Sequence, residues 1–280
     1  MADNTDILYI NTTAVHPAKT PFSYGTSNLF LLDWGTPDAE MFMDAVPLAD
    51  GSAFRGRVTK ARNFTLGIVV SDVGTAAKGQ DVWGEVLALV SANNGIVDYR
   101  YVRQTGAGAT IDRRLQAIVV GEPAWRWSEA NSGDGLRLSG NVFITLPCVA
   151  PFPWWRDTDY TEVTLSPTGT TPASSAITRG GHLACGLEVK ISTAGTLGSM
   201  TMLDGNRSLT LAATVSGTPK GIDRFYTDPH AVAVDAGVTS GIPGSLSLHS
   251  ATTTITATPI AGASGAHTVR LRYFKTWKTP

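Results

Sequence analysis

Charged side chains are scarce in this sequence of 280 residues, at 16% of the total, against roughly 25% in ordinary globular proteins. Lys and Arg number 22 and Asp and Glu 23, so the formal net charge is −1. A chain without a basic excess releases few counterions from a nucleic-acid backbone. We therefore expect no sequence-specific nucleic-acid binding. A weakly charged surface favours self-association instead.

Cysteines and long apolar segments are also few. Cys148 and Cys185 give no disulfide framework and no zinc-binding spacing; free thiols are the expectation, and a single bridge between them is the alternative. No apolar run reaches the roughly 20 residues that span a bilayer, and residues 1–6 lack the basic start of a signal peptide. We expect no membrane insertion, and a protein made in the cytoplasm that stays there or leaves within a larger particle.

The residues that are present favour β-structure. The chain holds 29 glycines, and short apolar segments alternate with polar residues at the period of a strand. Residues between Thr36 and Phe54 follow no such pattern and are expected to be irregular. Turn-forming residues 131–135 predict a hairpin. The strands expected in the first half are Ile7–Ile10, Phe30–Leu32, Phe64–Val70, Ile96–Val102, Leu115–Val120, Ala124–Trp127, Leu136–Leu138 and Asn141–Leu146.

One helix is predicted, over about residues 81–93. Asp81 is a candidate N-cap, and an apolar stripe follows it at the spacing i, i+3, i+4 and i+7. The helix should end at Asn93–Gly95, because Asn and Gly tolerate a left-handed turn. The stripe consists of Trp83, Val86, Leu87 and Val90.

The second half of the chain has a different texture. About seven short segments rich in Thr, Val, Leu and Ile follow Thr158, with no helical window among them, and this pattern is typical of a β-sandwich. Residues 150–157, with two prolines and three aromatic side chains, form a rigid and bulky segment. The expected domains are therefore 1–157 and 158–280.

The order of these elements resembles the distal tail proteins of long-tailed phages. Three segments carry the resemblance: Arg62–Leu66 as the opening strand, Trp83–Gly95 as the single helix, and Val142–Arg156 as a strand that runs into a proline–aromatic end. The second domain is similar to the galectin-like sandwich of many family members. The resemblance implies a mostly β fold, with a sandwich- or barrel-like domain of the tail-tube type followed by a galectin-like β-sandwich.

The resemblance also implies a function. Distal tail proteins form a ring, typically a hexamer, that joins the end of the tail tube to the tail-tip hub or baseplate. The implied partners are further copies of the chain, the tube protein, the tape-measure protein and the hub, and the implied location is the virion tail tip. An extended belt arm is expected near residues 1–60. No enzyme activity and no cofactor are implied.

The residues themselves offer weak candidates for catalysis or metal binding. Asp157 and Asp159 could supply two carboxylates, but such pairs usually serve turns. Glu122 and Glu129 flank tryptophans in a way that superficially suggests a sugar cleft. Neither pair matches a complete catalytic set. His182 and Cys185 lie three residues apart, but zinc needs three or four converging ligands. We assign no catalytic, cofactor or metal residue.

The tryptophans are the remaining candidates. Four of them lie close together in the sequence: Trp125, Trp127, Trp154 and Trp155. Strand alternation places the first two on one face. Each buries roughly 150–250 Å², so core or subunit interface is the favoured interpretation and sugar binding the alternative. Three hypotheses follow: an assembly protein, a carbohydrate-binding adaptor that contacts the host surface, and a glycan hydrolase supported only by scattered acids.

Overall fold

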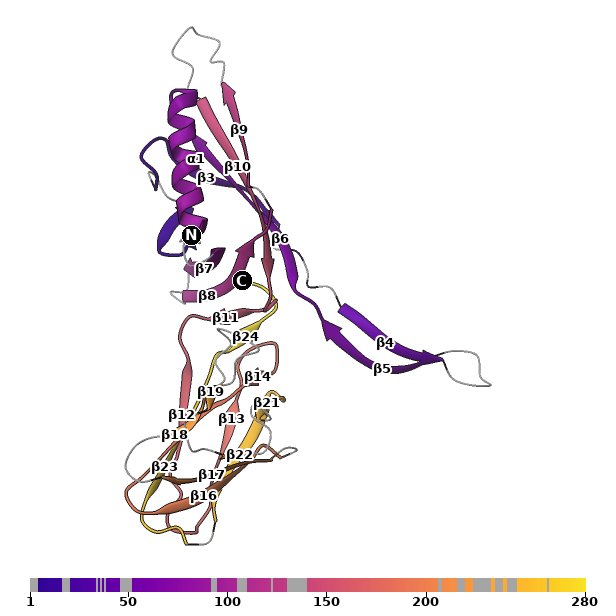
Figure 1. The fold of residues 1–280 in the computed structure, drawn as a ribbon, viewed down its shortest axis with the longest axis vertical. Coiled ribbons are helices and arrows are strands. Elements are labelled where there is room, and N and C mark those ends of the chain that lie inside the picture. Colours follow the sequence, from indigo (N-terminus) through magenta and orange to yellow (C-terminus); the bar gives the residue numbers. More distant parts are fainter. Residues whose placement is uncertain are drawn as a thin grey trace. The chain divides into compact units, whose positions relative to one another are not determined.

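The computed structural model is mostly β, with one helix among the residues it describes (Figure 1). This confirms the predicted fold class. Contacts divide the chain into Met1–Pro153, here unit 1, and Trp154–Pro280, unit 2. The division falls inside the proline–aromatic segment, whereas we expected it after Asp157. The described residues are 5–16, 21–33, 35, 37, 39–45, 52–91, 95–104, 110–121, 123–129, 140–205, 208–215, 220–223, 233–234, 239–240, 246–260 and 262–280.

Unit 1 is built on one antiparallel sheet in the strand order β2-β1-β7-β8-β10-β6-β3. Strand β10 has two partners on one side, because β9 pairs with its first half and β8 with its end. The bounds are β1 (Thr5–Ile10), β2 (Thr13–His16), β3 (Thr26–Asp33), β6 (Arg62–Ser71), β7 (Ile96–Gln104), β8 (Thr110–Val119), β9 (Ala124–Glu129) and β10 (Gly140–Ala150).

The core of unit 1 follows from alternation along β6 and β10. Buried residues face one another in register across the two strands, as in Ile144 opposite Ile68 and Leu146 opposite Leu66. Successive side chains of a strand point to opposite faces, so one face of the sheet takes the apolar half of each strand. Helix α1 (Ala76–Ser91) contacts β10, β7 and β9.

The helix begins five residues before the predicted N-cap, Asp81, which is exposed inside the helix. Thr75 precedes the helix, and its hydroxyl accepts a hydrogen bond from Lys78 N at 3.4 Å. The buried side runs through Gly79, Val82, Val86 and Val90, while Trp83 and Leu87 of the predicted stripe are partly buried. The first turn was missed because its one buried residue is a glycine, which an apolar pattern does not register.

Residues between Thr36 and Phe54 are not irregular, as we expected. Strand β4 (Ala39–Ala45) pairs with β5 (Ser52–Thr59) in a separate two-stranded sheet. Lys60 and Glu40 form an ion pair at 3.2 Å beside this ribbon. The alternation was absent from the sequence because these strands pair only with each other among the described residues, so no larger sheet imposes an apolar face.

Unit 2 contains two five-stranded antiparallel sheets. We call them the β23 sheet, in the order β12-β23-β15-β18-β19, and the β22 sheet, in the order β13-β22-β16-β17-β20. The bounds are β11 (Trp155–Asp157), β12 (Thr161–Leu165), β13 (Ala173–Thr178), β14 (Cys185–Gly186), β15 (Glu188–Thr193), β16 (Leu197–Leu203), β17 (Ser208–Val215), β18 (Lys220–Asp223), β19 (Ala233–Val234), β20 (Thr239–Ser240), β21 (Ser247–Leu248), β22 (Thr252–Pro259), β23 (His267–Tyr273) and β24 (Thr276–Trp277).

The two sheets enclose one apolar core, which makes unit 2 the predicted sandwich. Val189 and Leu271 enter this core from the β23 sheet, and Met200, Met202 and Ile255 enter it from the β22 sheet. One small two-stranded sheet, in which β14 pairs with β21, also belongs to the unit, and β11 pairs with β24. The galectin-like assignment of this sandwich stays a prediction.

Candidate assembly surface

Trp125 packs on the helix of unit 1. Its ring stacks on that of Trp83 in α1, with centroids 6.4 Å apart and planes inclined by 21°. Both side chains are partly buried. An aromatic pair of this kind contributes about 0.5–1.5 kcal/mol beyond its buried area, so the stack fastens α1 to the edge strand β9.

Trp127 also faces the helix, and it therefore lies on the same side of β9 as Trp125. A Cβ added at Gly79 of α1 would lie 3.0 Å from Trp127 Cε3, and one added at Gly140 of β10 would lie 1.8 Å from Cη2. Both glycines therefore leave room for the indole. Trp125 and Trp127 both contact α1, and they pack the helix against β9 and β10.

A shallow depression lies over β9 and β10. Its volume is about 400 Å³. Phe143 and the exposed Arg126, which are register partners, contribute an aromatic ring and a cation. This combination suits a side chain from a neighbouring protein better than a reaction, because the lining includes no acid or imidazole that could activate the hydroxyl of Ser128 or Thr145. The lining residues are Ala124, Trp125, Arg126, Ser128, Phe143 and Thr145.

A second feature of unit 1 was not predicted. Ile96 of β7, Ile118 of β8 and Val120 are 46%, 38% and 40% exposed. Ile96 and Ile118 are direct register partners, and Val120 follows Ile118 by two residues, so the three side chains share one face. We call them the apolar trio. Exposed apolar side chains that cluster in this way mark contact surfaces.

Trp154 and Trp155 belong to unit 2 and play different parts. Trp155 is fully buried, and Trp154 is partly buried. Strand β11 pairs Trp155 with Trp277 of β24. Trp277 Nε1 donates to Asp157 Oδ1 at 2.6 Å, and the Trp277 ring meets that of His182 edge to face at 4.8 Å. The proline–aromatic segment thus fastens the C-terminal strand.

The carboxylates and the zinc candidates of the sequence do not converge on a site. Asp157 accepts a hydrogen bond from Trp277 Nε1, and its Oδ2 lies 3.8 Å from Lys275 Nζ. Asp159 is exposed. Glu122 and the side chain of Glu129 lie outside the described residues. Among the described residues, no group of three or more His, Cys, Asp or Glu side chains could hold a metal ion.

Both cysteines are free and buried, as expected. Burial raises the pKa of Cys185 to about 12 and that of Cys148 to about 11, although a hydrogen bond with Tyr99 opposes the second shift. The Tyr99 hydroxyl lies 3.0 Å from Cys148 Sγ. Thiols in this state are poor nucleophiles.

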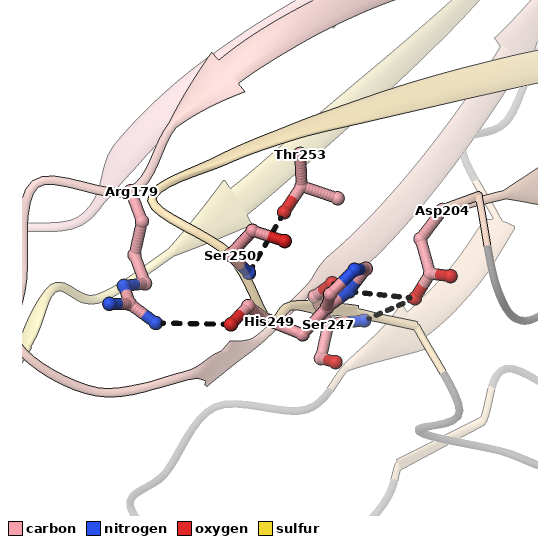
Figure 2. A network of polar contacts seen from close by, with 6 residues as sticks. All are labelled: Arg179, Asp204, Ser247, His249, Ser250 and Thr253. Carbon is pink, nitrogen blue, oxygen red and sulfur yellow. Dashed lines mark hydrogen bonds and ion pairs between the residues drawn. The ribbon is translucent and has the colours of Figure 1, made fainter.

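The described residues of unit 2 include a Ser–His–Asp grouping, drawn in Figure 2. Asp204 is buried and accepts a hydrogen bond from the backbone N–H of Ser247 at 3.2 Å. His249 Nδ1 lies 3.9 Å from Asp204 Oδ2 and 3.3 Å from the Ser247 carbonyl oxygen. Ser247 thus enters through its backbone and not its hydroxyl.

The same network continues on both sides of His249. Arg179 Nη1 donates to the His249 carbonyl oxygen at 3.5 Å, and Ser250 N donates to Thr253 Oγ1 at 3.3 Å. These contacts fasten residues 246–250 between strands. A catalytic triad needs a serine hydroxyl hydrogen-bonded to the imidazole, so the composition of this group suggests an enzyme but its geometry does not.

In the part of the chain that is described, no helix is long and apolar enough to cross a membrane.

Comparisons with known proteins bear on the fold. No family model matches the chain, and no curated protein matches it. The solved structure of the Dit (gp 19.1) protein of phage SPP1, called a paradigm of the hub adsorption apparatus in phages that infect Gram-positive bacteria, is similar with a TM-score of 0.56 and 12% identity, over 97% of this chain and 99% of that one.

Two structures of the phage p2 baseplate in its activated conformation are more distant. The one with Ca has a TM-score of 0.43 at 11% identity, over 97% of this chain and 98% of that one. The one with Sr has a TM-score of 0.42 at 11% identity, over 96% and 98%. The resemblance to distal tail proteins is therefore confirmed at the level of the fold, which this chain shares with the SPP1 Dit protein over nearly its whole length.

Proposed function

We propose that this protein is a structural subunit of a phage tail tip. It forms a ring, which we propose is a hexamer, and this ring joins the tail tube to the hub or baseplate. The observation that carries the proposal is the shared fold with the SPP1 Dit protein across both units. A resemblance confined to one unit would fit any β-sandwich protein. The same two units in the same order favour the same structural role in a phage tail tip.

The surface of unit 1 supports an assembly role. The apolar trio leaves Ile96, Ile118 and Val120 open to solvent, where a partner would shield them. Among the described strands, β9 pairs only with β10, so it has an edge that another chain can extend. Edge strands in a free monomer invite pairing with other chains, and a ring subunit uses that tendency.

Within the ring the neighbours are further copies of this chain, and above and below it are the tube, tape-measure and hub proteins. The β4–β5 ribbon is the candidate belt arm. The protein is assembled in the host cytoplasm and ends in the virion, and it carries out no catalysis. In this ring, residues 1–157 form the ring itself, and residues 158–280 project outward from it as a collar.

Light scattering and negative-stain imaging of the purified protein test whether it forms a ring. We expect a closed ring whose central channel is wide enough for DNA, with a mass that is a whole multiple of 29.5 kDa. If the chain stays monomeric alone, incubation with the tube and hub proteins should give the ring. A monomer under both conditions would overturn the proposal.

One observation favours carbohydrate binding as a second candidate function. Tyr160 is 47% exposed, and the guanidinium of Arg272 lies 4.7 Å from the centroid of the Tyr160 ring. Arg272 Nε also donates a hydrogen bond to Glu162. An aromatic ring beside charged hydrogen-bonding groups can bind a sugar. Trp277 is less suited to this role, because its indole donates a hydrogen bond to Asp157 and its ring contacts that of His182.

A glycan array with the full chain and with Tyr160→Ala tests this candidate. We expect binding that the substitution abolishes while the thermal unfolding temperature is preserved. Equal binding by the two proteins, or none by either, would remove it.

A further inference from the structure

The two sheets of unit 2 differ in charge. The five strands of the β22 sheet contain no Asp, Glu, Lys or Arg. The β23 sheet carries charges of both signs, among them Glu162, Glu188, Lys190 and Arg272, which form ion pairs. Soluble surfaces are normally about a quarter to a third charged. A neutral sheet face next to a charged one therefore requires an explanation other than solubility.

The outer face of the β22 sheet is a ladder of hydroxyl groups. Every second residue of β22 points outward, which places Thr252, Thr254, Thr256 and Thr258 on one line, while Thr253, Ile255 and Ala257 are buried. Thr252 and Thr254 are exposed, and Thr256 and Thr258 are partly exposed. We call this surface the hydroxyl face.

Neighbouring strands extend the hydroxyl face in register. Thr178 of β13 lies opposite Thr252, with the two hydroxyls 3.5 Å apart. On the other side Thr201 of β16 lies opposite Thr258 and contacts Thr210 of β17 at 3.1 Å between hydroxyl oxygens. The face is thus continuous across four strands, β13, β22, β16 and β17.

Two large apolar side chains stand on the same face. Leu203 of β16, opposite Thr256, is 44% exposed, and Ile260, just beyond β22, is 41% exposed. Apolar side chains on an uncharged sheet lower the cost of removing that face from water. They also make a charged partner unsuitable, because no charged side chain among the described residues of the face would compensate its desolvated charge.

From these observations we infer that the hydroxyl face binds the hydroxyl face of a second copy of this chain. A hydroxyl donates one hydrogen bond and accepts two, so identical hydroxyl ladders can satisfy each other. A face that carried Lys or Glu would oppose like charges when it met itself. Self-complementarity of this kind gives a two-fold contact, in which a residue i of one copy meets a residue j of the other while j meets i. Only residues at the axis meet their own counterparts, and the middle of the face, where Thr254 lies, is where we place that axis.

The size of the face predicts a weak contact. Strands about 4.8 Å apart with a rise of about 3.4 Å per residue give four strands of about seven residues a flat area of roughly 450 Å². Two copies would bury roughly 900 Å², less than the roughly 1,200 Å² of most stable complexes. The pairing should therefore be reversible and visible only at high concentration.

The two-fold contact differs from the contacts of the proposed ring. A cyclic ring repeats a head-to-tail interface and contains no two-fold axis between neighbours. Pairing through the hydroxyl face therefore turns a monomer into a dimer, and it joins one ring to another where the chain is assembled in rings. The inference does not depend on the ring, and the two can fail separately.

Light scattering of the full chain over a concentration series tests the inference. We expect the mass to double at high concentration and the doubling to persist in 1 M salt, since no ion pair holds the contact. Thr254→Lys, at an exposed site in the middle of the face, should weaken the pairing by about tenfold or more. A mixture of Thr254→Lys and Thr254→Glu should restore it, because opposite charges then meet across the axis.

Thr164→Lys is the matched control, because Thr164 is an exposed threonine in β12 of the β23 sheet. It should pair as the wild type does. Unchanged thermal unfolding of all variants would show that they fold. The inference is overturned if the wild type never doubles, if Thr254→Lys doubles normally, or if Thr164→Lys has the same effect. Failure of the mixture to recover would rule out a two-fold axis beside Thr254.

Discussion

The indole of Trp127 occupies the space that a side chain at position 140 would need. Gly140 opens β10, and Trp127 lies on the neighbouring strand β9. A Cβ at position 140 would lie 1.8 Å from Trp127 Cη2 and 1.9 Å from Cζ2. The pairing of these two strands therefore depends on the absence of a side chain as much as on the presence of one.

Gly140→Ala should destabilise unit 1 by about 1–3 kcal/mol, the usual cost of overpacking. Equilibrium urea unfolding measures this change. Gly84→Ala is the control, because a Cβ there has no neighbour within 4 Å, and alanine should stabilise the helix by about 0.5–1 kcal/mol. Opposite signs are expected for the two variants. A neutral Gly140→Ala variant would mean that Trp127 can move aside.

Trp277→Phe should destabilise unit 2 through the loss of one hydrogen bond to a carboxylate. Bonds of this type contribute about 1.5–3 kcal/mol, and the donor–acceptor distance of 2.6 Å is short. A double-mutant cycle with Asp157→Ala separates the bond from the lost indole area, because alanine removes the acceptor whereas asparagine would keep one. We expect a coupling energy above about 0.5 kcal/mol. Additive effects would show that the contact contributes nothing of its own.

The thiols should resist modification in the folded protein. Because burial raises the pKa of Cys148 and Cys185 to about 11 and 12, almost no thiolate exists near neutral pH. An Ellman assay at pH 7.5 should report no reactive thiol in buffer and two per chain in denaturant. Rapid reaction of either cysteine in buffer would contradict the burial of that residue.

The same shifts predict a loss of stability at alkaline pH. An unfolded thiol ionises near pH 8.5, whereas the folded thiols stay neutral until about pH 11 and 12. The stabilising effect is therefore complete below pH 8.5 and declines as the pH rises toward the folded values. Urea midpoints at pH 7.5, 9 and 10 measure this decline. A Cys148→Ala, Cys185→Ala double variant should show a flatter pH profile between 8.5 and 10.

Ile118→Arg should disrupt assembly without unfolding the chain. Ile118 is exposed and pairs with Ile96 in the apolar trio, and a charge there would have to be desolvated in any contact. We expect the association constant to fall by about tenfold or more, which corresponds to about 1.4 kcal/mol. Thr110→Arg, at an exposed position of the same strand, should assemble normally. If Ile118→Arg also assembles normally, the trio is not a contact.

The sequence was informative where apolar residues alternate over a long segment. Strand β6 and the helix could be predicted because their buried faces repeat at the periods of a strand and a helix. The start of α1 could not, since Gly79 is buried without contributing an apolar side chain. Strand β13 was missed because Ser and Ala make up four of its six residues, and these residues give a weak β signal on their own.

The candidate site was predicted less well than the fold. Four tryptophans close in sequence were grouped, but Trp125 and Trp127 lie in unit 1 and Trp154 and Trp155 in unit 2. The partner of the proline–aromatic segment, Trp277, is 120 residues from Asp157, and no local pattern joins them. The apolar trio depends on the register between β7 and β8, which a single sequence does not specify.

The branched pairing of β10 has a consequence for folding during synthesis. This strand, the last of unit 1, hydrogen-bonds β6, β8 and β9, all of which leave the ribosome before it. Contacts between segments far apart in a chain form slowly. A nascent chain that ends before residue 140 thus holds three strands that lack a common partner, and each has an unpaired edge on which other chains can aggregate. Late chaperone release, timed to the emergence of β10, would suit such a chain.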